Sequence, residues 1–126
     1  MNRALALSMW GVALLLTACV DEKPSAIKPT PDDVTRRACH TVLYVVERSN
    51  HYFALNLSAG GKSSASPDVE LRAAGRELLA AAEEAYALEM NSDGEVDMTQ
   101  SEARIATAQQ KAMAVCVGLM GEPPWA

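Results

Sequence analysis

The fold depends on the stretch LRAAGRELLAAAEEAYAL, residues 71–88. Its apolar residues recur at alternating spacings of three and four, the pattern of a helix that packs along its length against other helices. They are Leu71, Ala74, Leu78, Ala81, Ala85 and Leu88. Half of them are alanine, so a neighbouring helix can approach closely. We predict a helix that starts with Ser66 as N-cap and Pro67 in its first turn and ends near Met90.

A second helix with the same spacing is predicted to start at Thr99. Thr99 as N-cap and Glu102 three residues later form the pattern of a capping box. The apolar positions are Met98, Ile105, Ala108, Ala112, Val115 and Leu119. Gly121 and the two prolines after it end this helix. Trp125 lies beyond the end, where it either folds back over the core or faces a partner.

The pattern before residue 66 is less regular. Helical spacing begins near Asp32 or Asp33 and predicts a first helix. Its apolar positions are Val34, Ala38, Val42, Val45 and Tyr52. Residues 41–46 are rich in β-branched side chains, and apolar residues alternate over 53–57, so a β-hairpin within residues 41–58 is the alternative. Residues 59–66 contain two glycines and three serines and are expected to form a loop.

The N-terminus carries the features of an export signal. Arg3 precedes a mostly apolar run, residues 4–16, which two small residues follow. The run is shorter than the roughly 20 residues that a membrane-spanning helix needs. Its last part, Leu16-Thr17-Ala18-Cys19, resembles the lipobox of bacterial lipoproteins.

This resemblance implies that residues 1–18 are removed as a signal peptide and that Cys19 becomes the lipidated first residue. The sulfur would carry a diacylglycerol, and the new amine commonly carries a further acyl chain such as palmitate. Residues 19–31, with three prolines, would tether the domain of residues 32–121, followed by a tail of residues 122–126. The protein would then be anchored outside the cytoplasm, at the cell membrane or outer membrane. A plain cleaved signal peptide or a short uncleaved anchor is the alternative.

Charge and cysteine content narrow the partners and the chemistry. Beyond residue 18 the chain holds 16 acidic and 10 basic residues, a formal charge of −6. Nucleic acid and anionic lipid are therefore poor partners. Cys39 and Cys116 are the remaining cysteines, and an exported protein meets oxidising conditions, so we expect them to form a disulfide. Free thiols, a metal site or a catalytic cysteine are the alternatives.

The expected disulfide constrains how the helices run. In a plain three-helix bundle with a straight first helix, Cys39 and Cys116 would lie about 15 Å apart along the axis, beyond the reach of a disulfide. A reversal of the chain within residues 48–52 removes this mismatch, because the last helix then runs antiparallel to the first. We therefore predict a break near Asn50, with residues 51–58 returning as a short helix or strand.

Residues 89–100 resemble the calcium-binding loop of EF-hand proteins. The resemblance implies oxygen ligands from Glu89, Asn91, Asp93, Glu95, Asp97 and Gln100, with Glu95 acting through its backbone carbonyl. Two positions depart from the family pattern. Glu89 stands where the family has aspartate, and Gln100 stands where it has a bidentate glutamate. The alternative interpretation is an acidic turn that simply ends the preceding helix.

The remaining sequence contains no recognisable catalytic pattern. His40 and His51 would lie about three turns apart on a continuous helix, too far to share a metal ion. We therefore expect an all-α protein, a small antiparallel bundle of three main helices with one disulfide, the first helix broken near Asn50. The expected function is non-catalytic and without cofactor: a lipid-anchored domain that docks an envelope protein or component. The alternative is weak calcium binding by residues 89–100.

Overall fold

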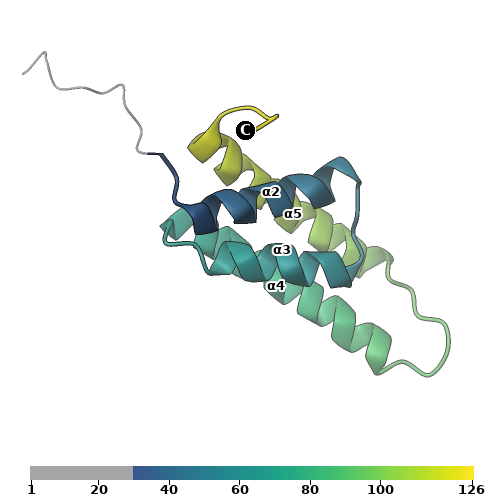
Figure 1. The fold of residues 1–126 in the computed structure, drawn as a ribbon. Helices are drawn as coiled ribbons and strands as arrows, with labels where there is room; N and C mark the ends of the chain where they lie inside the picture. The colour runs from purple at the N-terminus through teal and green to yellow at the C-terminus, as the bar shows by residue number, and fades with distance from the viewer. Residues whose placement is uncertain (1–29) are drawn as a thin grey trace, which may run out of the picture.

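The computed structural model describes residues 30–126, and this part of the chain contains four α-helices and no strand. The helices are α2 (Asp33–Glu47), α3 (Phe53–Ser64), α4 (Val69–Met90) and α5 (Thr99–Met120). Consecutive helices run in opposite directions (Figure 1). The all-α fold is confirmed, whereas the expected count of three main helices is wrong. None of these helices is both long enough and apolar enough to cross a membrane.

The predicted signal peptide, residues 1–18, lies outside the described residues, as does the predicted lipid site at Cys19. The same holds for the predicted tether of residues 19–31 except for its last two residues. These features stay predictions.

The predicted break near Asn50 is confirmed and divides the expected first helix into α2 and α3. The α2 helix ends at Glu47, and Ser49 adopts a positive φ of 47° that turns the chain. The carbonyl of Asn50 accepts hydrogen bonds from the amides of Asn56, at 2.9 Å, and Gln109, at 2.6 Å. Gln109 also donates to Asn56 Oδ1. A buried polar network therefore holds the break against α5.

The loop expected over residues 59–66 is wrong, because α3 continues through it to Ser64. The alternative of a hairpin within residues 41–58 is also wrong, because residues 41–47 lie in α2 and residues 53–58 lie in α3. Gly60 on α3 and Gly75 on α4 serve the packing of the two helices. A Cβ on Gly60 would lie 2.5 Å from the backbone nitrogen of Leu79, and one on Gly75 would lie 2.4 Å from that of Ser64. Each of these two glycines thus allows α3 and α4 to approach with backbone nearly in contact.

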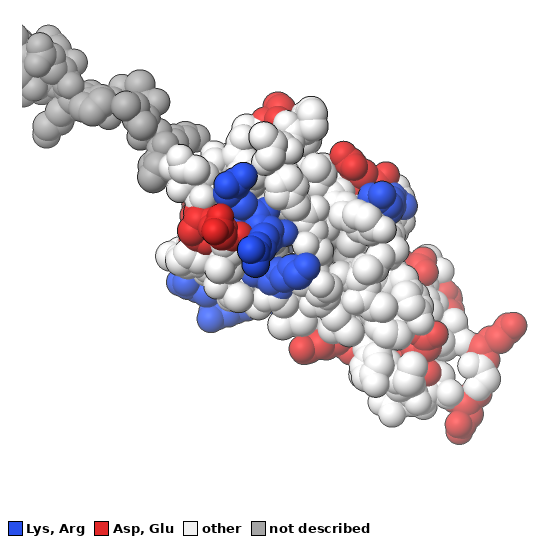
Figure 2. Space-filling model, viewed as in Figure 1, with Lys and Arg blue, Asp and Glu red and all other residues white. Residues whose placement is uncertain are grey.

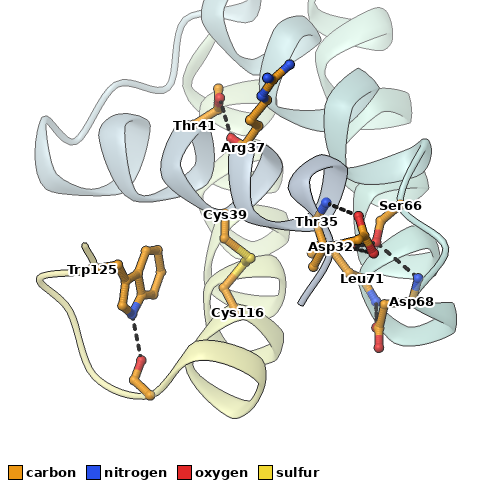
Figure 3. The surroundings of a disulfide bond; sticks show 11 residues. Asp32, Thr35, Arg37, Cys39, Thr41, Ser66, Asp68, Leu71, Cys116 and Trp125 are labelled. Atoms are coloured by element: carbon orange, nitrogen blue, oxygen red, sulfur yellow. Dashed lines mark hydrogen bonds between the residues drawn. A yellow bond between two sulfur atoms is a disulfide. The ribbon is translucent and has the colours of Figure 1, made fainter. Parts of the chain in front are cut away.

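Two predicted helix starts move by one or two residues. Asp68, and not Ser66, caps α4, with its carboxylate accepting a hydrogen bond from the Leu71 amide at 2.8 Å. Ser66 is instead buried and bonds Thr35 Oγ1 at 2.6 Å, which joins the α3–α4 turn to α2 (Figure 3). Thr99 is the first residue of α5 and not its cap, so the predicted capping box does not form.

The core lies between the four helices and consists mainly of small side chains. Its fully buried apolar residues are Ala38, Val42, Val45, Ala59, Leu71, Leu78, Ala82, Ile105 and Ala112. The Cys39–Cys116 disulfide lies in this core and joins α2 to α5 across a Cα–Cα distance of 5.5 Å (Figure 3). The predicted pairing is therefore confirmed, and the reversal near Asn50 is what makes the two cysteines level.

Candidate functional site

Charge is unevenly distributed along the bundle. Residues 83–102, which we call the acidic end, cover the last turns of α4, the α4–α5 link and the first turn of α5. This segment holds seven acidic residues and no Lys or Arg: Glu83, Glu84, Glu89, Asp93, Glu95, Asp97 and Glu102. On the face shown in Figure 2, Lys and Arg lie mostly over the part near the start of α2, whereas the opposite end shows Asp and Glu alone. The acidic end therefore attracts cations and repels anions.

Three aromatic side chains meet beside the acidic end. We call Tyr52, Phe53 and Tyr86 the aromatic cluster. The ring centroids of Tyr52 and Phe53 are 4.4 Å apart, and those of Phe53 and Tyr86 are 5.2 Å apart in an edge-to-face arrangement. Phe53 is buried, but Tyr52 is 52% exposed and Tyr86 is 47% exposed. Met90, one helical turn beyond Tyr86, is 57% exposed. Contiguous exposed apolar surface of this kind is typical of an interaction site.

The helix pairing explains how this cluster forms. Because the chain reverses at Asn50, α3 begins with Tyr52 and Phe53 at the end of the bundle where α4 finishes. Tyr86 lies in the last turns of α4 and therefore meets them. The sequence reasoning missed this cluster, since Tyr52 was placed on a core-facing position of one long helix. The signal available was the concentration of aromatics, with Tyr52, Phe53 and Tyr86 making up three of the five beyond residue 18.

Glu89 belongs to the same surface. It lies three residues after Tyr86 on α4 and faces Tyr52. The pKa of Tyr52 is raised by loss of hydration at its hydroxyl, by the negative charge of Glu89 and by a hydrogen bond to the Glu89 side chain. The Glu89 side chain is half-buried, and its Oε2 atom is buried without a hydrogen-bond partner. Buried carboxylate oxygens normally have a donor. Glu89 therefore places a negative charge beside the Tyr52 ring, and one of its two carboxylate oxygens is buried without a donor.

The residues expected as calcium ligands lie in the predicted helix–loop–helix order. Asn91 caps α4 through its amide, Gly94 adopts a positive φ of 103°, and Gln100 lies in the first turn of α5. Asp97 accepts a hydrogen bond from the Thr99 amide at 3.0 Å. Hydrogen bonds from the Thr99 side chain and amide lower the pKa of Asp97. These contacts describe an acidic turn in which the carboxylate of Asp97 is bound within the turn itself.

Asp97 and Gln100 line one small hollow, but the other acidic side chains expected as ligands do not gather around Asp97. Glu89 is turned toward Tyr52, and Asp93 and Glu95 are exposed to solvent. Within residues 30–126, no group of three or more His, Cys, Asp or Glu side chains is placed to hold a metal ion. Calcium binding by residues 89–100 therefore stays a prediction without a gathered ligand set.

An open groove of about 570 Å³ runs between α4 and α5. Its floor includes Ala80, Ala81, Ala103 and Ala108, and its rims carry the exposed ion pairs Arg104–Glu84 and Lys111–Glu77. No cysteine, histidine or serine lines it. Four charged side chains of the groove thus pair with each other, and its hydroxyl, on Thr107, donates to the Ala103 carbonyl at 3.0 Å.

The opposite end of the bundle is closed by the C-terminal tail. Trp125 folds back, and its indole nitrogen donates to the Gly121 carbonyl at 2.9 Å (Figure 3). Its ring packs on the core and meets the His40 ring edge to face, with centroids 5.8 Å apart. Of the two alternatives for this tryptophan, the first is confirmed. His51 lies in the α2–α3 turn, and within the described residues it joins no metal-binding group with His40.

Comparison with known proteins adds no relative. No family model, no curated protein and no solved structure matches the chain.

Proposed function

We propose that this chain is a lipid-anchored, non-catalytic protein of the bacterial cell envelope that docks a partner protein. The observation that carries the docking is the exposed aromatic cluster with Met90 at the acidic end. The core of the bundle is filled by buried small and aliphatic side chains, so the exposed rings of Tyr52 and Tyr86 are not needed to fill it. Binding a partner explains their exposure, because tyrosine and methionine are common in protein interfaces.

The lipid anchor is the second part of the proposal and rests on Leu16-Thr17-Ala18-Cys19. Lipidation at Cys19 would hold the start of α2 toward the membrane. The α4 helix contains 22 residues and therefore spans about 33 Å. The start of α3 and the last turns of α4, which carry the aromatic cluster, lie away from the start of α2 (Figure 1). An anchor at Cys19 would thus leave this cluster facing away from the lipid, where a partner can reach it.

We propose that the protein is non-catalytic because of the side chains that line the α4–α5 groove. The α4–α5 groove has paired charges and an alanine floor, and it contains none of the cysteine, histidine or serine side chains that commonly act as nucleophile or base.

Photo-crosslinking in the native host tests the docking. A photoreactive phenylalanine analogue replaces Met90 in one variant and Val69 in the other. Val69 is a matched control, because it lies at the opposite end of the same helix and is 67% exposed. We expect light-dependent crosslinking to one protein of defined mass from position 90 and none from position 69. No adduct from position 90, or the same adducts from both positions, would refute docking by this surface.

Mass spectrometry tests the anchor separately. Protein isolated from the native host should lack residues 1–18 and carry an added acyl mass at Cys19. An intact leader or an unmodified thiol would overturn the anchor and leave the docking surface to be judged on its own experiment.

The alternative of weak calcium binding is separated by titration calorimetry on the full chain. Since Glu89 faces Tyr52 and Gln100 is neutral, we expect no saturable heat at about 1 mM calcium, the range of weak extracellular sites. Saturable heat that Asp93→Asn abolishes would favour the calcium function.

A further inference from the structure

We infer that the surface around the aromatic cluster binds a cationic side chain of the partner, and an arginine guanidinium best of all. The inference rests on the proposed docking function and names the chemistry of what docks. The juxtaposition that carries it is two exposed tyrosine rings, Tyr52 and Tyr86, next to the carboxylate of Glu89.

The rings supply the first attraction. The face of an aromatic ring is electronegative and attracts a cation that lies within about 6 Å of its centre. Phe53 lies between Tyr52 and Tyr86 and contacts both rings, so the two tyrosines are held at the edges of one surface. Met90 extends this surface and offers apolar contact to the aliphatic stem of a long basic side chain.

Glu89 supplies the second attraction. Its Oε2 atom lacks a hydrogen-bond partner. The ion pairs of residues 30–126 are Arg104–Glu84 and Lys111–Glu77, so neither involves Glu89. No Lys or Arg occurs in the sequence between Arg76 and Arg104. The negative charge of Glu89 is therefore uncompensated by any neighbouring base of its own helix.

The molecule itself contains an example of the contact that we infer. The guanidinium of Arg48 lies over the Tyr44 ring at 3.6 Å from its centroid. Arg48 also donates to the Tyr44 carbonyl, so it is already engaged near the α2–α3 turn. Arginine is favoured over lysine because its planar group stacks on rings and can bond a carboxylate with two donors.

The negative charge of the acidic end disfavours the other ligands that could bind this surface. A second copy of this chain would bring two acidic ends together, and the repulsion of seven acids on each side opposes this pairing. The same repulsion opposes anionic lipid and nucleic acid. A choline headgroup carries a cation but also a phosphate, which the acidic end disfavours. A basic segment of a protein is the occupant that the surface fits.

Nuclear magnetic resonance on the full chain, in an uncharged maltoside detergent with labelled tyrosine rings, tests the inference. The probe is a capped tetra-arginine peptide, with capped tetra-glutamine and choline chloride as comparisons. At pH 8 we expect saturable shifts of the Tyr52 and Tyr86 signals with tetra-arginine alone. Added salt should weaken the binding, because part of the attraction is between charges.

Two variants of equal charge separate the proposed site from the general field. Glu89→Gln should weaken tetra-arginine binding about tenfold, because it removes the carboxylate that faces the rings. Glu102→Gln removes the same charge from the acidic end, on α5 and so on a helix that contributes no ring to the cluster, and should change the affinity by less than about twofold. Unchanged melting temperatures would show that both variants fold. Equal losses would refute the site.

The remaining outcomes each overturn one step. Choline binding as tight as tetra-arginine would refute a peptide partner in favour of a quaternary-ammonium ligand. If tetra-arginine causes no shift while position 90 still crosslinks, the cationic partner is refuted and the docking function stands. If both experiments fail, the docking function is refuted as well.

Discussion

Replacing Gly60 or Gly75 by alanine should destabilise the bundle, although alanine ordinarily favours a helix over glycine by about 1 kcal/mol. The new Cβ would lie 2.5 Å or 2.4 Å from backbone nitrogen of the facing helix. Backbone cannot rotate away as a side chain can, so α3 and α4 must separate. Taking about 3 kcal/mol for this overpacking, less about 1 kcal/mol for helix propensity, leaves a net loss of about 2 kcal/mol at each site.

Gly61 is the matched control, because it is the next residue along α3 and a Cβ there meets nothing within 4 Å. Gly61→Ala should therefore stabilise the protein by up to about 1 kcal/mol. Denaturation in urea, followed by circular dichroism with the disulfide intact, measures all three variants. In a domain of this size the loss at Gly60 or Gly75 corresponds to a melting temperature lower by about 10 °C. If Gly60→Ala or Gly75→Ala were as stable as Gly61→Ala, the close contact of α3 with α4 would be refuted.

Three further predictions concern the core and one helix cap. Replacing both Cys39 and Cys116 by alanine should lower the free energy of unfolding by about 4.5 kcal/mol in the chain-entropy estimate for a separation of 77 residues; a reductant should destabilise the natural protein but not this variant, and equal effects on both would contradict the pairing. Gln109→Leu removes the donor to Asn56 Oδ1 and one of the two donors to the Asn50 carbonyl, and should lower stability by about 1–3 kcal/mol in urea denaturation; a neutral result would show that the network does not hold the break. The backbone amide of Thr35 donates to Asp32 and lowers the pKa of this carboxyl below its ordinary 3.8. The stability that this hydrogen bond contributes is complete above pH 3.8 and is lost as the pH falls through the pKa of Asp32 in the folded state. Melting temperatures of Asp32→Asn should therefore fall less than those of the natural protein below about pH 4, and parallel pH profiles would count against this cap.

Local patterns in the sequence were sufficient for most of the helices. Of the seam predicted from Leu71 to Leu88, four positions are buried in α4, namely Leu71, Ala74, Leu78 and Ala85, whereas Ala81 is half-buried and Leu88 is 41% exposed. Gly121 ends α5 with a positive φ of 81°. The break near Asn50 followed from combining helix length with the pairing of Cys39 and Cys116. Each of these inferences used either the helical period or the expected disulfide, and both can be read directly from the sequence.

The errors and omissions share a different cause. Gly60 and Gly61 looked like loop residues because glycine weakens an isolated helix. Gly60 nevertheless lies in a helix, because the backbone of Leu79, nineteen positions later, packs where a side chain on residue 60 would be. The aromatic cluster was missed for the same reason, because Phe53 and Tyr86 meet only once α3 lies antiparallel to α4.

For the candidate site, the sequence alone established that residues 83–102 are strongly acidic, since a count of charges needs no coordinates. Which of those acids faces an aromatic ring is a matter of helix rotation and packing. Glu89 turns toward Tyr52 whereas Asp97 bonds Thr99 in its own turn. Contacts between residues distant in the chain depend on how whole helices pack against one another, and the spacing of apolar residues within one helix does not determine that packing.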